Sequence, residues 1–121
     1  MLDTRSKILT LEAARGLHSV TLVTGAFDVL RAAHLRELRA APGTSLLVAV
    51  LPLAGEILPQ RARAEMVAGL RMVDYVVIAN ESELDALIQW LAPGTIVRLE
   101  ATDAERTRRL IEHVRRRQNC S

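Results

Sequence analysis

Aromatic residues are almost absent from this chain of 121 residues, in which Phe27, Tyr75 and Trp90 make up the 2% that are aromatic. A core must therefore be built from Leu, Val, Ile and Ala, and the 50% hydrophobic content is enough for one compact domain. So few rings also argue against a surface that stacks nucleic-acid bases on aromatic side chains. We expect residues 1–121 to form a single domain.

Cysteine and long apolar runs are scarce as well. Cys120 is the sole cysteine, so no internal disulfide can form and a reducing compartment is the simpler assumption. No charged-then-apolar leader opens the sequence, and no apolar run has the length of a membrane span. We therefore expect a cytoplasmic protein without a membrane partner.

Lysine is nearly missing too, since Lys7 is the sole example, and the net charge is a modest +2. Positive charge gathers near the end of the chain, at Arg106, Arg108, Arg109, Arg115, Arg116 and Arg117. A terminal basic run is more often a solvated face or tail than an anion or nucleic-acid patch. A nucleic-acid partner is therefore not expected, and a role as an arginine-tail nucleic-acid binder is the weakest of the functions considered.

Four short runs rich in β-branched residues recur along the chain, at 19–24, 45–51, 74–78 and 95–99. Each is nearly continuous rather than alternating, which is typical of strands buried on both faces. Helical spacing between the runs predicts an alternation of strands and helices, with right-handed crossovers and a parallel sheet. The expected fold class is a three-layer α/β domain with four parallel strands.

The expected helices have recognisable ends and apolar stripes. We expect them over 10–17, 30–40, 60–72, from Ser82 to Pro93, and from Asp103 onward. Ser82 and Asp103 are the predicted N-caps of the last two. Met66, Val67 and Leu70 are the predicted buried stripe of the helix over 60–72. In the helix that begins at Ser82, the inward-facing residues are Leu84, Leu87, Ile88 and Leu91.

The most informative stretch is 21-TLVTGAFDVLRAAHLREL-38, where a strand turns into a helix. Ligands of parallel α/β sheets bind at the carboxyl ends of the strands, and this turn lies at such an end. We expect Gly25 to let the backbone bend sharply, and the small Ala26 to leave amide N–H groups open to a ligand. Asp28 can cap the following helix, whose free N–H groups and dipole attract phosphate.

Arg31 and His34 lie three residues apart on that helix, so they project from neighbouring positions. Together they could hold negative charge, as a phosphate site requires. The alternative is that His34 is a hydrogen-bonded core residue, because it shares one helical face with Leu30 and Leu38. From the residues alone, both interpretations stay open.

The run 25-GAFDVLRAAH-34 resembles the signature of the cytidylyltransferase-like nucleotidyltransferases, Gly-x-Phe-Asp, two residues, then His-x-Gly-His. The run 63-RAEMVAGLRMVDYVV-77 resembles the family helix that begins with Arg and closes in Arg-x-Val-Asp-x-Val. The segments 7–12 and 73–97 are most similar to the adenylyltransferase domain of bacterial ADP-heptose synthases, with glycerol-phosphate cytidylyltransferase as a cousin. The resemblance implies a Rossmann-like fold with strand order 3-2-1-4, from which the usual fifth strand has been lost.

The chemistry that the resemblance implies is attack by a sugar phosphate or similar ester on the α-phosphate of a nucleoside triphosphate, which releases pyrophosphate. ATP or CTP with Mg²⁺ would be required, and no residue is assigned as a metal ligand. By resemblance, His34 touches the triphosphate, with Arg31 in the place of the other motif histidine. The remaining residues implied to bind nucleotide or phosphate are Gly25, Ala26, Phe27, Asp28, Arg63, Arg71 and Thr107.

Several family features are altered on the ligand side. Ala33 replaces the motif glycine, the loop 52–59 is short and has no lysine, and 98-RLEAT-102 stands where the family has Lys-Gly-Gly-Asp. We therefore expect activity to be weak or lost, and the alternative is a non-catalytic binding or interaction protein on the same fold. The strand over 95–99 would lie at an open edge, which favours a homodimer.

Overall fold

A computed structural model describes residues 3–27, 32–41, 45–53, 55, 58–91, 93 and 95–99. The first part of the chain forms a short 3-10 helix and the first strand and helix, followed by alternating strands and helices. The elements are η1 (Thr4–Lys7), β1 (Ile8–Leu9), α1 (Leu11–Ala14), β2 (Thr21–Gly25), α2 (Ala32–Ala40), β3 (Leu46–Val50), α3 (Gln60–Ala68), β4 (Tyr75–Ile78), α4 (Glu81–Leu91) and β5 (Thr95–Arg98).

The strands form one parallel sheet in the order β1-β4-β3-β2-β5. The α/β fold class and the order of the four expected strands are confirmed. The expected strand count is one short, because Ile8 and Leu9 pair with Val76 and Val77 of β4. Two residues are too few to carry a periodic signal, since strands usually run for about 5–6 residues. The predicted loss of a strand after β5 concerns residues outside the described part of the chain.

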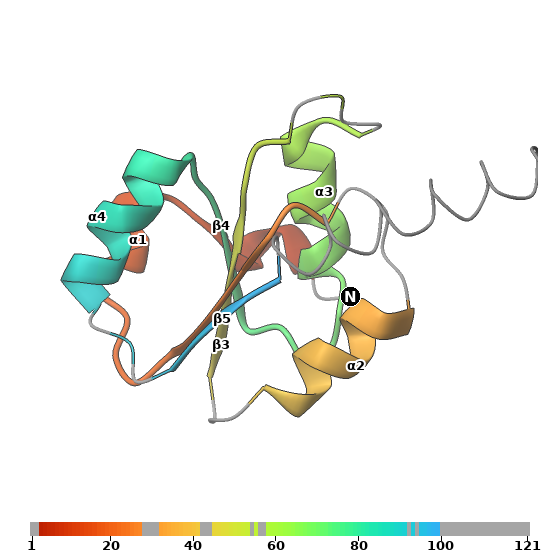
Figure 1. Cartoon of the computed structure of the whole chain (residues 1–121), viewed down its shortest axis with the longest axis horizontal. Coiled ribbons are helices and arrows are strands. Elements are labelled where there is room, and N and C mark those ends of the chain that lie inside the picture. Colours follow the sequence, from red (N-terminus) through yellow and green to blue (C-terminus); the bar gives the residue numbers. More distant parts are fainter. Residues whose placement is uncertain are drawn as a thin grey trace, which may run out of the picture.

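Helices cover both faces of the sheet, which gives three layers (Figure 1). On one face α2 and α3 pack against a cluster that includes Val48, and on the other α1 and α4 pack against a cluster that includes Leu47. Neighbouring residues of β3 thus belong to opposite clusters, because successive side chains of a strand point to opposite faces. This two-sided burial explains why the strands are continuous apolar runs.

Helix α3 ends at Ala68, earlier than the expected Met72. The Gly69 N–H donates to the carbonyls of Glu65 and Met66 at 3.1 and 3.2 Å, which closes the last turn. The prediction that Met66 is buried is wrong, since 39% of this residue is exposed. The buried residues of α3 are Arg63, Ala64, Val67 and Ala68, so the predicted burial of Val67 is confirmed. The predicted stripe did not include Arg63, because arginine is seldom buried unless it is paired.

The N-cap of α4 is Asn80, and the prediction of Ser82 is wrong. Asn80 Oδ1 accepts from the Glu83 N–H at 2.8 Å, and Glu83 Oε1 accepts from the Asn80 N–H at 3.0 Å. This reciprocal pair is a capping box. Ser82 Oγ donates to Asn80 Oδ1 at 2.9 Å and so supports the cap. The inward positions predicted for this helix are confirmed, since all four belong to or pack against the core cluster.

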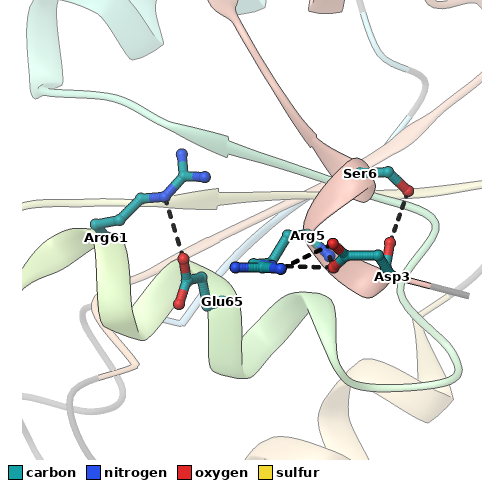
Figure 2. Close-up of polar contacts among 5 residues, drawn as sticks. All are labelled: Asp3, Arg5, Ser6, Arg61 and Glu65. Carbon is teal, nitrogen blue, oxygen red and sulfur yellow. Dashed lines mark hydrogen bonds and ion pairs between the residues drawn. The ribbon is translucent and has the colours of Figure 1, made fainter.

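Two ion pairs lie near each other, one at the start of the chain and one on α3 (Figure 2). The Asp3 carboxylate accepts from Arg5 Nε and Nη2 at 3.0 Å, and Arg61 pairs with Glu65 at 3.5 Å. The hydrogen bonds from Arg5 lower the pKa of Asp3 below its ordinary value. The pKa of Arg5 is raised, chiefly by Asp3 and further by the charge of Glu65. η1 and α3 are in contact, which brings the charge of Glu65 near Arg5.

The expected helix from Asp103 and the arginine run that follows lie outside the described residues. Among the residues that the structure does describe, none of the helices has both the length and the apolar character needed to cross a bilayer.

Candidate functional site

The turn at the carboxyl end of β2 is bent at Phe27, not at Gly25. Phe27 has a φ of 55°, in the left-handed region that non-glycine residues seldom adopt. Gly25 is still part of β2 and is not among the residues with positive φ. The expectation that Gly25 provides the sharp bend is therefore wrong.

The reason for a glycine at position 25 is the ring of Phe27. A Cβ atom on Gly25 would lie 2.8 Å from Phe27 Cε2 and 2.9 Å from Cζ, which is closer than real Cβ atoms approach carbon. The ring is 1% exposed, so its neighbours restrict its movement. The left-handed backbone of Phe27 and the bare backbone of Gly25 thus form one packed turn.

His34 lies beside this turn, as the sequence predicts. Its ring centroid is 5.6 Å from that of Phe27, and the two planes are inclined by 56°. The residue is 4% exposed, and Leu38, one turn further along α2, is also buried. The structure therefore brings His34 to the carboxyl edge of β2, in surroundings that suit the core interpretation.

Arg63 is fully buried and binds backbone carbonyls at this same edge. Its Nη1 donates to Ala26 O at 2.7 Å and to Leu51 O at 2.8 Å, and its Nε donates to Leu58 O at 3.1 Å. With 0% of the residue exposed, the side chain is enclosed by the protein. Arg63 therefore lies beside the Gly25–Phe27 turn, and its described contacts hold the protein backbone.

Gln60 also binds backbone carbonyls at the ends of the strands, and it was not among the predicted site residues. Its Nε2 donates to Val50 O at 2.9 Å and to Ala79 O at 3.2 Å, at the ends of β3 and β4. A glutamine in the first turn of a helix is common on protein surfaces, so its type carried little signal. Its spacing of three residues from Arg63, which puts both on one helical face, was the available clue.

Arg71 lies near the amino ends of the strands, whereas the Gly25–Phe27 turn lies at their carboxyl ends. Helix α3 starts near the carboxyl ends of the strands and returns the chain to the amino end of β4. Beyond Arg71, Asp74 exchanges hydrogen bonds with Leu46, the first residue of β3, at 2.8 and 3.1 Å. The structure therefore does not bring the exposed Arg71 together with the other site residues, because one helix length separates it from them.

Three predicted site residues, Asp28, Arg31 and Thr107, lie outside the described residues. Within the described ranges, no three His, Cys, Asp or Glu side chains gather in a way that could hold a metal ion.

Comparison with known proteins supplies relatives, although no family model matches the chain. It is 34% identical over 107 residues to the bifunctional protein HldE of Wolinella succinogenes, covering 79% of this chain and 22% of that protein. The HldE proteins of Geobacter metallireducens and Rhodopseudomonas palustris strain TIE-1 are 32% and 36% identical over 108 residues. Those matches cover 80% of this chain and 22% and 21% of the relatives, so the chain spans a small part of their length.

A solved structure supports the fold. The lipopolysaccharide core biosynthesis protein from Thermoplasma volcanium superposes with a TM-score of 0.58, covering 64% of this chain and 70% of the other. At 22% identity, this likeness shows the shared α/β architecture alone. The chain is therefore a homologue of one segment of the bifunctional HldE proteins, and its resemblance to the cytidylyltransferase-like nucleotidyltransferases is confirmed.

Proposed function

We propose that this chain is a nucleotidyltransferase-like protein whose site is degenerate. Its ancestral reaction is the transfer of a nucleotidyl group from a nucleoside triphosphate to a sugar phosphate or similar ester, with release of pyrophosphate. In this chain that transfer is weak or lost. The similarity to HldE proteins supports the family origin, and the altered motif around Arg31 and Ala33 supports the loss.

The burial of Arg63 is the observation that carries the proposal. Catalysis of nucleotidyl transfer is mainly positioning, together with neutralisation of charge on the phosphates. Arg63 lies beside the turn, but its guanidinium is fully buried and donates to the carbonyls of Ala26, Leu51 and Leu58. Loss of one charge-stabilising contact in a transition state costs about 2.7–4 kcal/mol, or at least about a hundredfold in rate.

His34 and Arg31 are the residues that we propose for any remaining catalysis. A guanidinium at position 31 would pair well with a phosphate oxygen. The ring of His34 must leave part of its contact with Phe27 to reach a ligand, since it is 4% exposed. The backbone of Gly25, Ala26 and Phe27 would contribute further contacts. Asp28 and Thr107 are further residues that we propose for phosphate binding, and Arg71 is not part of this proposed site.

The nucleotide would be ATP or CTP. Mg²⁺ in such sites is held largely by substrate phosphates with one or two carboxylates. We assign it here to the triphosphate of the nucleotide, and we propose no residue of the chain as a metal ligand. The metal would supply charge neutralisation on the phosphates.

Two measurements test the proposal. Thermal unfolding is followed with ATP or CTP and Mg²⁺, and pyrophosphate release is assayed with heptose 1-phosphate and glycerol phosphate. A nucleotide present at about a hundred times its dissociation constant would stabilise the fold by about 2.7 kcal/mol. We expect a small shift and little release. Clear turnover that His34→Ala abolishes would overturn the degenerate-site proposal.

The second candidate function is a non-catalytic interaction protein on the same fold. Its support is the β5 edge of the described sheet, where Ile96 is 37% exposed, and the exposed Trp90 at the end of α4. Edge strands and exposed large apolar side chains favour pairing with another chain. We propose a homodimer through this edge or an adjacent helix. A mass equal to one chain across micromolar concentrations, measured by light scattering, would contradict it.

A further inference from the structure

Helix α3 begins against the usual rules for helix starts. Its N-cap is Pro59, no side chain caps it, and the first turn holds no acidic residue. Arg61 and Arg63 follow instead, although the helix dipole makes this end unfavourable for cations. Local helix stability therefore does not account for Arg63. Breaks in a local rule of this kind tend to occur at functional sites.

The hydrogen bonds made by the first turn of α3 explain why Arg63 is there. Arg63 and Gln60 together donate to five backbone carbonyls. Four of these carbonyls lie at the carboxyl ends of three adjacent strands: Ala26 after β2, Val50 and Leu51 at the end of β3, and Ala79 after β4. One helical turn is thus bonded to the edge where the proposed ligand site lies.

We infer that Arg63 is a positioning residue that orients the Ala26–Phe27 peptide for an anionic ligand; this inference rests on the proposed function. A planar trans peptide directs its C=O and its N–H in opposite directions. Because Ala26 O accepts from Arg63 at 2.7 Å, the Phe27 N–H points away from the buried guanidinium. That N–H is the donor offered to a phosphate or pyrophosphate oxygen.

The same guanidinium also holds the neighbouring loop. Leu51 O accepts from Arg63, while the Leu51 N–H donates to Gly25 O at 2.9 Å. Two residues of the Gly25–Phe27 turn are therefore tied to Arg63, Ala26 directly and Gly25 through Leu51. Nη1 makes both of these contacts, and Nε of the same rigid guanidinium makes the third, to Leu58 O. A lysine ammonium would have to serve all three acceptors from one atom.

This geometry separates positioning from direct contact with a ligand. Arg63→Lys keeps the positive charge and loses the fork, so a residue that acts through charge would tolerate it. The matched control is Arg61→Lys, two residues away on the exposed side of α3, where the partner is the Glu65 side chain. Neither change alters the net charge.

The test uses amide hydrogen exchange and NMR titration with inorganic pyrophosphate on the full chain. In Arg63→Lys, we expect exchange of the Leu51 N–H to accelerate by about tenfold or more, since local opening has its own free energy. The Asp74 N–H, at the other edge, should keep its rate, and Arg61→Lys should match the wild type at both. Unchanged exchange at Leu51, or equal acceleration at Leu51 and Asp74, would overturn the inference.

In the titration, the Phe27 N–H of the wild type should shift with pyrophosphate. Arg63→Lys should weaken the apparent affinity about tenfold or more, as a difference of about 1.4 kcal/mol requires. Retention of full affinity by Arg63→Lys would overturn the inference. If the wild type gives no response, the anionic-ligand part of the inference is overturned while the proposal of a degenerate site stands, and the exchange at Leu51 still decides whether Arg63 holds the turn.

A measurement on the wild type needs no substitution, which matters if Arg63→Lys fails to fold. A positioning residue predicts that pyrophosphate shifts the Phe27 N–H and leaves the Arg63 Nε–H resonance unchanged. A larger shift at Arg63 Nε–H than at Phe27 would mean that the guanidinium itself contacts the anion. That result would overturn the inference.

Discussion

The ring of Phe27 folds back over Gly25, so that a Cβ at position 25 would lie 2.8 Å from Phe27 Cε2. The strand end, the left-handed residue and the neighbouring ring of His34 are therefore packed together. Arg63 also donates to the carbonyl of the Ala26–Phe27 peptide, so the turn is bonded to the start of α3.

Gly25→Ala should lower the free energy of unfolding by about 1–3 kcal/mol, because an added methyl group overpacks a buried site. Urea denaturation measures this. The control is Gly16→Ala, where the nearest atom to an added Cβ is 3.6 Å away and the change should cost little. The double variant with Phe27→Leu should lose less than the sum of the single losses, since the two residues touch. Strict additivity would show that the ring is not the obstacle.

Arg63→Met should destabilise the fold by about 3 kcal/mol, since each buried carbonyl left without a donor costs about 1–3 kcal/mol. The control Arg61→Met removes an exposed pair and should stay within about 0.5 kcal/mol of the wild type. Both values come from urea denaturation. Equal effects of the two substitutions would contradict the structural importance of the Arg63 contacts.

Asn80→Ala should cost about 1 kcal/mol through loss of the α4 N-cap. Ser82→Ala is the matched control and should cost less, because Ser82 donates to the cap without bonding the helix backbone. Thermal or urea unfolding distinguishes them. A larger loss from Ser82→Ala would support the cap that the sequence predicted.

The pKa of Asp3 should lie below its ordinary 3.8, because Arg5 hydrogen-bonds its charged form. A depressed carboxyl pKa contributes stability above the unfolded pKa, and this stability disappears as the pH falls through the folded pKa. Both groups are exposed, so the contribution is small and screened by salt. A carboxyl NMR titration should show the pKa of Asp3 rising towards 3.8 in Arg5→Ala and unchanged in Arg61→Ala.

Much of the fold could be predicted because its signals are local. The apolar runs that became β2, β3, β4 and β5 are continuous because both faces of the sheet are covered, and helical spacing between them requires parallel crossovers. The end of α3 also depends on local contacts, since Gly69 bonds to carbonyls three and four residues earlier, although the predicted end lay a few residues too late. The turn at Gly25–Phe27 was found from its position after a strand, with His34 beside it.

Contacts between distant segments determined the rest. Ile8 and Leu9 form β1 only because they pair with the edge of β4. Two residues are too few for a pattern that would predict this strand. Arginine is usually found at the surface, but Arg63 is buried because backbone carbonyls meet its guanidinium in space. These acceptors are 37, 12 and 5 residues away in the chain. Arg71 is separated from the turn by the length of α3. These outcomes depend on which backbone groups meet in space, and hydrogen bonds over such separations leave no periodic trace in the sequence.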